Sequence, residues 1–342
     1  MAFYKRLIQW YLLNKRDLPW RNTTDPYAIW LSEIILQQTR VAQGLPYFVS
    51  FIDAFPTVFD LASADEDQVL KLWQGLGYYS RARNLHKTAK FIAQDLGGVF
   101  PDSYAGLLKL GGVGPYTAAA IASFSYDEAV PVVDGNVYRV LARHFGIETD
   151  IAHSSARVIF TEFAASLMPE NEAANANQAI MEFGALQCVP RNPDCQKCVM
   201  QSTCVAFKVG KVNELPVKSK KKPVKIRHFN YLLIRDSLDK IALRKRTAKD
   251  IWQNLYEFPL IETNSAVNID DLTPMVLEIR EDASVYETAD YDVVHKLSHQ
   301  HLHIKFWDVR VNGILNNGIA TEDLHKYALP TALLNYVEKN WK

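Results

Sequence analysis

The stretch from Leu107 to Ile121 reads Leu-Leu-Lys-Leu-Gly-Gly-Val-Gly-Pro-Tyr-Thr-Ala-Ala-Ala-Ile. This pattern predicts a helix, a glycine turn and a second helix that begins at Pro115, where the missing N–H of proline costs nothing. Gly112 and Gly114 would let backbone N–H groups approach an anion closely, and the second helix would turn its positive dipole end toward it. A phosphate group is therefore the natural ligand of this turn, although a plain connection between helices uses glycine equally well.

The sequence on both sides of this turn is helical. From residue 1 to about residue 205, apolar side chains recur with the helical period and alternating segments are nearly absent. Asp25 followed by Pro26 has the composition of a helix start, and the segment 63–66 has the spacing of a capping box. The N-terminal stretch lacks both an uninterrupted apolar core and a small-residue cleavage site, so we interpret it as a helix. We predict an all-α first domain over residues 1–210.

The pattern changes in the last third of the chain. Residues 229–234 and 241–246 have the composition of strands, and apolar residues alternate with polar ones over 302–306, as in a half-buried strand. The segment that follows Pro330 is helical again. We therefore predict a second, smaller α+β domain over residues 229–342.

A lysine-rich connector, residues 211–228, joins the two predicted domains. It carries seven Lys and Arg residues against one Glu, whereas the chain as a whole has no formal net charge. We interpret it as a solvated linker, although a segment that crosses a DNA backbone would use the same residues. No stretch approaches the roughly 20 consecutive apolar residues that a membrane span needs. We expect a cytoplasmic protein without membrane association, located at the nucleoid if it is bacterial.

All four cysteines lie close together in the sequence, which leaves none for disulfides elsewhere. Cys188, Cys195, Cys198 and Cys204 are separated by six, two and five residues. Four thiolates satisfy either a tetrahedral zinc ion or a 4Fe-4S cluster. Zinc ribbons and fingers usually present two close pairs, whereas this pattern has one close pair between wider gaps. The spacing therefore favours iron–sulfur over zinc, and either metal over four unrelated cysteines.

Two carboxylates stand in segments that allow a chemical role. Asp134 is placed to cap the helix that follows it, and helix amides would keep its carboxylate ionised. Glu33 lies in the mostly apolar segment 29–36, where a carboxylate is either on an exposed face or buried. Burial would raise the pKa of Glu33 and make it a general acid near neutral pH. The local pattern leaves a purely capping aspartate and a surface glutamate open.

Together these segments resemble the helix-hairpin-helix base-excision glycosylases of the endonuclease III and MutY type. The resemblance rests on the glycine turn, on the cysteine spacing directly after a helix, and on Ser-Glu-Ile-Ile-Leu-Gln-Gln-Thr at residues 32–39, which is similar to the SEIMLQQT motif of adenine glycosylases. It extends from Arg16 to about residue 310. It implies an all-α glycosylase domain with a 4Fe-4S cluster, and a hairpin that holds one DNA strand through Gly112 and Gly114, often with a monovalent cation bound to the main chain.

The resemblance also implies roles in catalysis. Glu33 would protonate adenine at N7, Asp134 would stabilise or trap the oxocarbenium ion, and Tyr116 and Asn136 would support that second step. Lyase-competent members carry a lysine at the place of Tyr116, and a phenol forms no Schiff base, so we predict a monofunctional hydrolase. The residues implied to bind adenine are Arg16, Leu18, Trp20, Arg21 and Gln178, and those implied to enter the duplex beside the opposite base are Gln38, Thr39, Leu76 and Tyr78.

The second domain resembles the Nudix-like domain with which the MutY family reads 8-oxoguanine. A box of clustered glutamates is absent from the sequence, so we predict no pyrophosphatase activity. The family uses a Phe-Ser-His loop before a strand, and this chain has Leu297, Ser298 and His299 there. Ser298 and His299 can hydrogen-bond an oxidised purine, but the aromatic side chain is replaced by an aliphatic one. This departure puts the strength of the 8-oxoguanine preference in question.

The expected partner is double-stranded DNA with adenine opposite 8-oxoguanine or guanine, bound by a monomer. Two other interpretations stay open. A mismatch glycosylase for thymine or uracil can share Tyr116 and the cysteine cluster, although Glu33 in its motif and the second domain favour adenine. A non-catalytic DNA-binding module with iron–sulfur or zinc would have no need of Glu33 at all.

Overall fold

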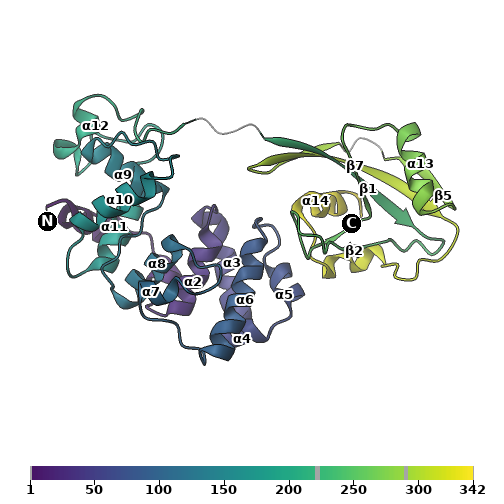
Figure 1. The fold of residues 1–342 in the computed structure, drawn as a ribbon, viewed down its shortest axis with the longest axis horizontal. Helices are drawn as coiled ribbons and strands as arrows, with labels where there is room; N and C mark the ends of the chain where they lie inside the picture. Colours follow the sequence, from purple (N-terminus) through teal and green to yellow (C-terminus); the bar gives the residue numbers. More distant parts are fainter. Residues whose placement is uncertain (1, 220–223, 289–291, 342) are drawn as a thin grey trace. The chain divides into compact units, whose positions relative to one another are not determined.

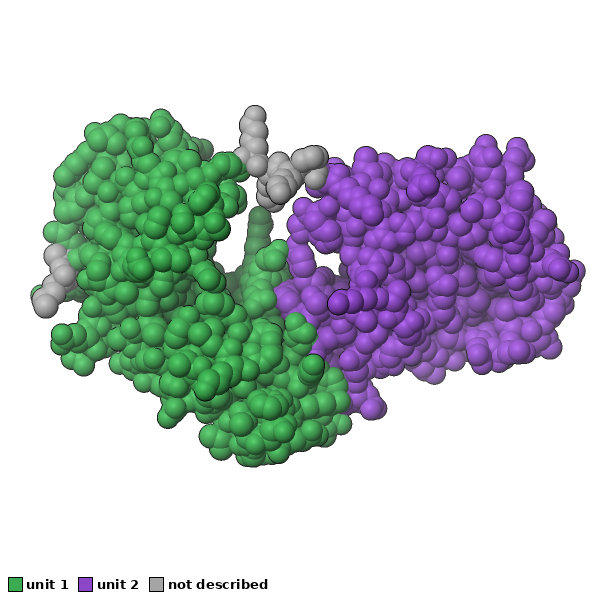
Figure 2. Space-filling model, viewed as in Figure 1, with its two compact units in different colours: residues 1–63, 84–220 green, residues 64–83, 221–342 purple. Residues whose placement is uncertain are grey.

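The structure is a computed structural model that describes residues 2–219, 224–288 and 292–341. The chain divides into two compact units, which are coloured separately in Figure 2. The first unit contains Met1–Ser63 and Asn84–Lys220, and the second contains Ala64–Arg83 and Lys221–Lys342. The short segment of residues 64–83 therefore packs with the C-terminal part of the chain, which nothing in its sequence indicates.

The described part of the first unit is helical and contains no strand, which confirms the predicted all-α class (Figure 1). Its helices are α1 (Ala2–Asn14), η1 (Pro19–Arg21), α2 (Pro26–Leu36), α3 (Val41–Ala54), α4 (Val58–Ser63), α6 (Ser80–Asp95, which begins in the second unit), α7 (Tyr104–Leu107), α8 (Pro115–Tyr126), α9 (Gly135–Phe145), α10 (Ala156–Leu167), α11 (Ala173–Leu186), η2 (Gln201–Thr203) and α12 (Val205–Lys208).

Two of the predicted helix starts are correct and one is wrong. Asp25 caps α2 by accepting a hydrogen bond of 3.0 Å from the amide of Tyr27. Pro115 is the first residue of α8. The predicted cap at Ser63 is wrong, because Ser63 is the last residue of α4 and its hydroxyl donates back to that helix. The capping box of the next helix, α5 (Glu66–Leu72), is formed by Asp65 and Gln68 instead.

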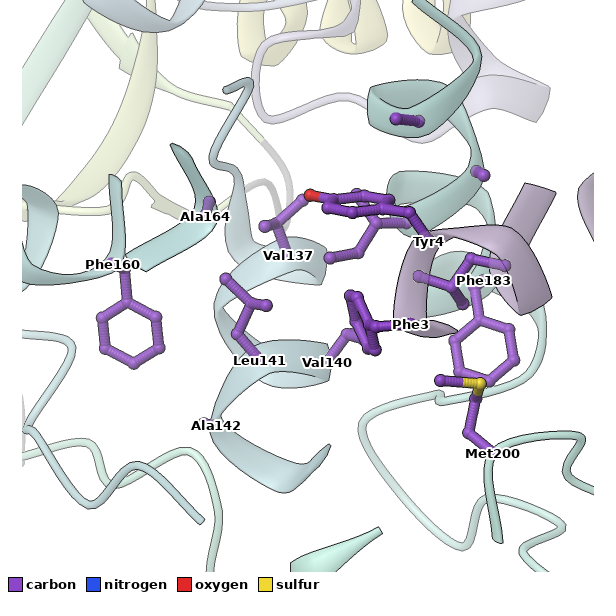
Figure 3. Packing of buried hydrophobic residues seen from close by; sticks show 14 of the residues in the cluster. Phe3, Tyr4, Val137, Val140, Leu141, Ala142, Phe160, Ala164, Phe183 and Met200 are labelled. Atoms are coloured by element: carbon purple, nitrogen blue, oxygen red, sulfur yellow. The ribbon is translucent and has the colours of Figure 1, made fainter. Parts of the chain in front are cut away.

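One core of the first unit joins helices from both ends of its sequence. Phe3 and Tyr4 of α1 pack with Val140 of α9 and Phe183 of α11, and Phe160 of α10 lies in the same cluster (Figure 3). These side chains are buried, and each fully buried one contributes roughly 1.5–3 kcal/mol to folding. The core thereby holds the N-terminal end of α9, where Asp134 stands, beside α11.

The second unit is built on a mixed five-stranded sheet with the order β4-β1-β7-β5, in which β6 also pairs with β7. The long strands β1 and β7 are parallel, and the other pairings in this sheet are antiparallel. A separate two-stranded ladder joins β2 and β3. The strands are β1 (Lys225–Arg235), β2 (Arg244–Lys245), β3 (Tyr256–Glu257), β4 (Leu260–Thr263), β5 (Ala283–Glu287), β6 (Val293–Lys296) and β7 (Gln300–Val311), and the helices besides α5 are α13 (Ile269–Ile279), η3 (Thr321–Lys326) and α14 (Thr331–Asn340).

Helices cover both faces of this sheet. On one face, Phe306 of β7 stacks on Tyr336 of α14 with ring centroids 4.0 Å apart. On the other face, Trp307 packs in one cluster with Leu272 and Val276 of α13. The predicted strands at 229–234 and 302–306 are present inside β1 and β7, and the predicted α+β class is confirmed. The predicted strand at 241–246 is reduced to β2 and an isolated bridge at Ile241.

The predicted linker is partly structured at both of its ends. Leu215 is buried in the core of the first unit, and the carbonyl of Val217 accepts a hydrogen bond of 3.0 Å from the amide of Ile151. Lys225 begins β1. Residues 220–223 lie outside the described residues. None of the helices in the described ranges combines the length and apolar character that crossing a bilayer requires.

Candidate active site

A cavity of about 180 Å³ opens in the first unit between α2, α8, α9, α11 and the segment around η1. All four residues predicted to act in catalysis line it, and so do all five predicted to bind adenine. Thr39 lines it as well. The predicted residues in its wall are Arg16, Leu18, Trp20, Arg21, Glu33, Thr39, Tyr116, Asp134, Asn136 and Gln178.

Glu33 is buried in this cavity, with 7% of the residue exposed, so the surface alternative is wrong. The reason is the character of α2, which is apolar on nearly all sides and is buried from Tyr27 to Ile35. Burial raises the pKa of Glu33 to about 7. A hydrogen bond from the Tyr116 hydroxyl and the charge of Arg21 act in the opposite direction, while the nearby Asp134 raises the pKa further. Glu33 is therefore a carboxyl group that can hold a proton near neutral pH.

Asp134 is the N-cap residue of α9, as its sequence position predicts. The amides of Asn136 and Val137 each donate to its Oδ1 at 2.8 Å, and Asn136 Nδ2 donates to Oδ2 at 2.7 Å. These hydrogen bonds favour the ionised carboxylate, but burial outweighs them and raises the pKa of Asp134 above its usual value. The helix amides therefore act as predicted, in favour of the ionised form, but they work against a desolvation that the sequence does not show.

A buried ion-pair cluster forms one wall of the cavity. Glu182 of α11 is 1% exposed and accepts hydrogen bonds from the backbone amide, Nε and Nη2 of Arg16 at 3.0, 2.8 and 2.6 Å. It also accepts bonds of 2.9 and 2.7 Å from Nη1 and Nη2 of Arg21. Burial alone would raise the pKa of Glu182, but these two arginines lower it to about 2. Glu182 therefore fixes the two predicted adenine-binding arginines to α11.

The sequence analysis did not identify Glu182 as part of the site. One signal was available, because Glu182 follows Gln178 by four residues and so lies on the same face of α11. Gln178 is itself held in place, since its Oε1 accepts a hydrogen bond from the Tyr11 hydroxyl of α1. Several apolar wall residues were not identified either: Ile29, Leu36, Val41, Phe124, Met181 and Ala185.

The glycine turn has the geometry that its sequence predicts. Gly112 has a φ of +74°, which favours glycine, and a Cβ there would lie 2.9 Å from the Cβ of Asn84. Gly114 has an extended backbone and is the N-cap residue of α8. The carbonyl of Gly111 accepts a hydrogen bond from the Thr88 hydroxyl of α6, which ties the turn to the helix behind it. The turn thus presents backbone groups and the N-terminus of α8.

The four cysteines line a second, mostly apolar cavity of about 30 Å³, with Val140, Phe183, Met200, Phe207 and Val212 among its other walls. Within the described ranges, no three His, Cys, Asp or Glu side chains stand close enough together to hold a metal ion. Arg143 of α9 lies beside this cavity. Its Nη1 is 3.5 Å from Cys188 Sγ and donates to the carbonyl of Val189 at 2.8 Å. All four thiols nonetheless line this one cavity, and thiolates are ligands that suit a soft metal cluster.

The residues predicted to contact the opposite base are divided between the two units. In the second unit, Tyr78 is 43% exposed and its hydroxyl shares a hydrogen bond with the Ser298 hydroxyl. Leu76 is buried there, with 6% exposed. Ser298 and His299 are exposed in the turn between β6 and β7, which is closed by a hydrogen bond of 2.9 Å between Leu297 and Gln300. In the first unit, Gln38 is exposed at a φ of +57°, directly before Thr39.

Comparison with known proteins agrees with this architecture. Residues 31–165 match the family described as the HhH-GPD superfamily of base excision DNA repair proteins, and residues 230–339 match a NUDIX domain. Among the solved structures that resemble the chain are two DNA-repair enzymes. One is a thermostable thymine-DNA glycosylase, with a TM-score of 0.56, 29% identity and coverage of 61% of this chain and 96% of that one. The other is endonuclease III in a non-covalent DNA complex, with a TM-score of 0.53, 19% identity and coverage of 61% and 95%, which shows a shared fold.

Among curated relatives, the adenine DNA glycosylase of Buchnera aphidicola subsp. Baizongia pistaciae is 38% identical over 260 residues. The match covers 76% of this chain and 74% of that protein. A second Buchnera adenine DNA glycosylase, from the subspecies Acyrthosiphon pisum, is 34% identical over 305 residues, which covers 88% of this chain and 85% of that protein. The chain therefore belongs to the adenine DNA glycosylase family, within the helix-hairpin-helix superfamily of base excision DNA repair enzymes.

Proposed function

We propose that this adenine DNA glycosylase hydrolyses the N-glycosidic bond of adenine that is mispaired with 8-oxoguanine or guanine in duplex DNA. The observation that carries the proposal is the placement of Glu33 and Asp134 in one cavity, with the pKa of Glu33 raised to about 7. A general acid works best when its pKa lies near the working pH. The cavity is also lined by polar side chains able to read a base, such as Arg16 and Gln178.

The reaction follows from these two carboxyl groups. The adenine is first extruded from the duplex, because its glycosidic bond is out of reach in the base stack. Glu33 donates its proton to N7, so that adenine leaves as a neutral base. Positive charge then develops on the sugar, and the Asp134 carboxylate, which Asn136 holds by two hydrogen bonds, stabilises or traps it. Glu33, now ionised, helps to deliver the water that completes hydrolysis.

Tyr116 makes the reaction hydrolytic. It stands in the wall of the cavity and donates its hydrogen bond to Glu33. Burial raises the pKa of Tyr116 well above its usual value, so the phenol stays protonated. A protonated phenol supplies no amine nucleophile for attack on the sugar. The product is therefore an abasic site in an intact strand.

The opposite base is read by the second unit. The hydroxyls of Tyr78 and Ser298 are hydrogen-bonded to each other, so two residues proposed to contact that base converge on one place. His299 is exposed beside Ser298 and can add a hydrogen bond to an oxidised purine. The clustered glutamates of a pyrophosphatase are missing from the sequence, so the domain serves recognition and not hydrolysis of nucleotides.

DNA would be held mainly through the hairpin and the cysteine loop. The amides around Gly112 and Gly114, at the N-terminus of α8, suit a phosphate and a bound monovalent cation, and such contacts position a duplex without reading its sequence. The four cysteines would bind a 4Fe-4S cluster, which stabilises the loop of residues 188–204 and takes no part in base excision. We expect a monomer that acts on chromosomal DNA in the cytoplasm, at the nucleoid of a bacterial cell.

A thymine mismatch glycosylase is the second candidate, because the solved thymine-DNA glycosylase resembles the first unit at 29% identity. A panel of end-labelled duplexes with A:8-oxoG, A:G, A:C, T:G and U:G decides between the two. Adenine release from A:8-oxoG and A:G, visible as strand cleavage only after alkali, is the expected result. Release of thymine or uracil with retention of adenine would overturn the substrate. Trapping of an enzyme–DNA adduct by borohydride would overturn the hydrolytic mechanism.

A further inference from the structure

Residues 64–83, here named the wedge segment, contain α5 and the turn that carries Tyr78. This segment packs with the C-terminal domain in one compact unit, and Figure 2 shows the two in one colour. The proposed function uses Tyr78 and Ser298 but gives no role to the polar contacts around α5. These contacts come from three places along the segment and meet three places of the C-terminal domain.

The first contact is centred on Asp67. Its Oδ1 lies 2.6 Å from Lys245 Nζ, and its Oδ2 accepts a hydrogen bond of 3.1 Å from the Tyr256 hydroxyl. Lys245 and Tyr256 are direct partners in the β2–β3 ladder. One carboxylate of α5 is therefore held by two residues whose spacing the ladder sets.

The second contact is made by the loop between β2 and β3. Glu66 accepts a hydrogen bond of 2.6 Å from Asn254 Nδ2, and Arg83 Nη1 donates to the carbonyl of Gln253 at 2.7 Å. This loop holds Trp252 at a φ of +59°, a backbone region that bulky residues rarely adopt, and Asn254 at +65°, where asparagine is tolerated. Such backbone strain costs roughly 1–3 kcal/mol per residue and persists where the surrounding structure requires it. Here it presents a carbonyl and an amide to the wedge segment.

The third contact lies at the end of α5 and leads to the turn. Lys71 Nζ donates to the carbonyl of Tyr327 at 3.2 Å. Beyond it, Trp73 Nε1 donates to the carbonyl of Gly77 at 3.0 Å, which shapes the turn, and Tyr78 has a φ of +48°. Both ends of α5 are thus attached to the C-terminal domain. Because the tightly folded turn follows α5 directly, the position of α5 determines the position of Tyr78.

The contacts of Glu66, Asp67, Lys71 and Arg83 with the C-terminal domain are here named the α5 clamp. We propose that the α5 clamp positions residues for opposite-base discrimination and that Asp67 is its central residue. The clamp holds Tyr78 beside the Ser298 turn, so that the two residues meet the opposite base as one preorganised surface. The inference rests on the proposed function, because it assumes that Tyr78 and Ser298 contact that base. Without the clamp, the two would have to be brought together at each binding event, and the ordering cost would weaken the recognition that needs both.

A double-mutant cycle of Asp67→Ala and Lys245→Ala in the full-length enzyme tests the clamp. Dissociation constants and single-turnover adenine release are measured on A:8-oxoG and A:G duplexes for each variant. We expect the preference for A:8-oxoG over A:G to fall about fivefold in each single variant, which is the effect of one partly exposed ion pair. In the double variant the preference should fall no further than in either single variant. Asp67→Glu, which keeps both hydrogen-bond acceptors, should restore most of the preference.

The controls separate the clamp from general stability and from the proposed function. Asp323→Ala removes another Asp–Lys pair of 2.6 Å in the second unit, to Lys326, and should leave the preference unchanged. Ser298→Ala should reduce the preference directly. Equal losses on A:8-oxoG and A:G, or no loss on either, would refute the clamp while the proposed function stands. A wild-type enzyme that releases adenine from both duplexes without preference would refute the clamp alone, and one that releases adenine from neither duplex would refute both.

Discussion

Glu33 and Tyr116 share a hydrogen bond inside the cavity, and this contact holds the pKa of Glu33 below the value that burial alone would produce. Without any such partner, a fully desolvated carboxyl group would hold its proton well above neutral pH and would donate it poorly. With it, the pKa of Glu33 is about 7. The tyrosine that we propose makes the reaction hydrolytic therefore also lowers the pKa of the proposed general acid.

The rate of adenine release should depend on the protonated form of Glu33. Single-turnover rates should be highest below pH 7 and fall as the pH rises through about 7, because the acid is lost there. Tyr116→Phe removes a contact that lowers the pKa of Glu33, so its profile should move to higher pH. A profile of Tyr116→Phe that coincides with wild type, or moves to lower pH, would contradict the assignment.

Glu33→Gln should lower the rate of adenine release by a factor of roughly 10² to 10⁴ while DNA affinity is kept. The variant should also be more stable than wild type at high pH. The folded-state pKa of about 7 exceeds the reference value of 4.5, so the stability that the proton contributes is fully present below pH 4.5 and is lost as the pH rises through 7. Thermal unfolding at pH 8 should show a gain of up to about 3 kcal/mol. A non-catalytic binding module would show the same gain in stability but would release no adenine with either residue at position 33.

Glu182→Gln should both destabilise the enzyme and shift its pH profile. The change leaves Arg16 and Arg21 with an uncompensated charge beside the cavity, at a cost of about 3 kcal/mol in the free energy of unfolding. The unpaired Arg21 should also lower the pKa of Glu33, so the midpoint of the rate profile should fall. Glu148→Gln, which removes an exposed ion pair with Lys211, is the matched control and should change neither quantity.

Protein isolated without air should contain about four iron atoms per chain, as one 4Fe-4S cluster requires. Cys198→Ala should lower both the cluster content and the melting temperature, because the thiol lies in the apolar cavity that the other three cysteines line. DNA affinity should fall with them. Stoichiometric zinc in place of iron would overturn the assignment of the metal.

Leu297→Phe should strengthen the preference for A:8-oxoG. Leu297 stands in the turn that carries Ser298, and an aromatic ring there can stack on a base, which is worth roughly 1–3 kcal/mol. The ratio of dissociation constants for A:G and A:8-oxoG should rise by about tenfold, within that range. Leu297→Met, of similar volume and without a ring, is the control. An equal gain for both variants would show that size and not the ring matters.

The sequence by itself determined the parts of this protein that depend on local chemistry. Asp25 and Pro115 mark helix starts because capping and the geometry of proline act within one turn of helix. Asp134 caps α9 for the same reason. The glycine turn, the cysteine spacing and the alternation in β7 are likewise patterns of a few residues, and they were sufficient for the fold class. The four residues proposed to act in catalysis were named from the family resemblance, and all of them line one cavity.

The tertiary structure decided what each of these groups can do. The burial of Glu33 and the pKa that follows depend on helices that close over α2. Glu182 and Arg16 are 166 residues apart, and only folding brings them together. The attachment of residues 64–83 to the C-terminal domain is equally invisible in the sequence. Local patterns report propensity and hydrophobic period, whereas desolvation and charge pairing arise between residues that are distant along the chain.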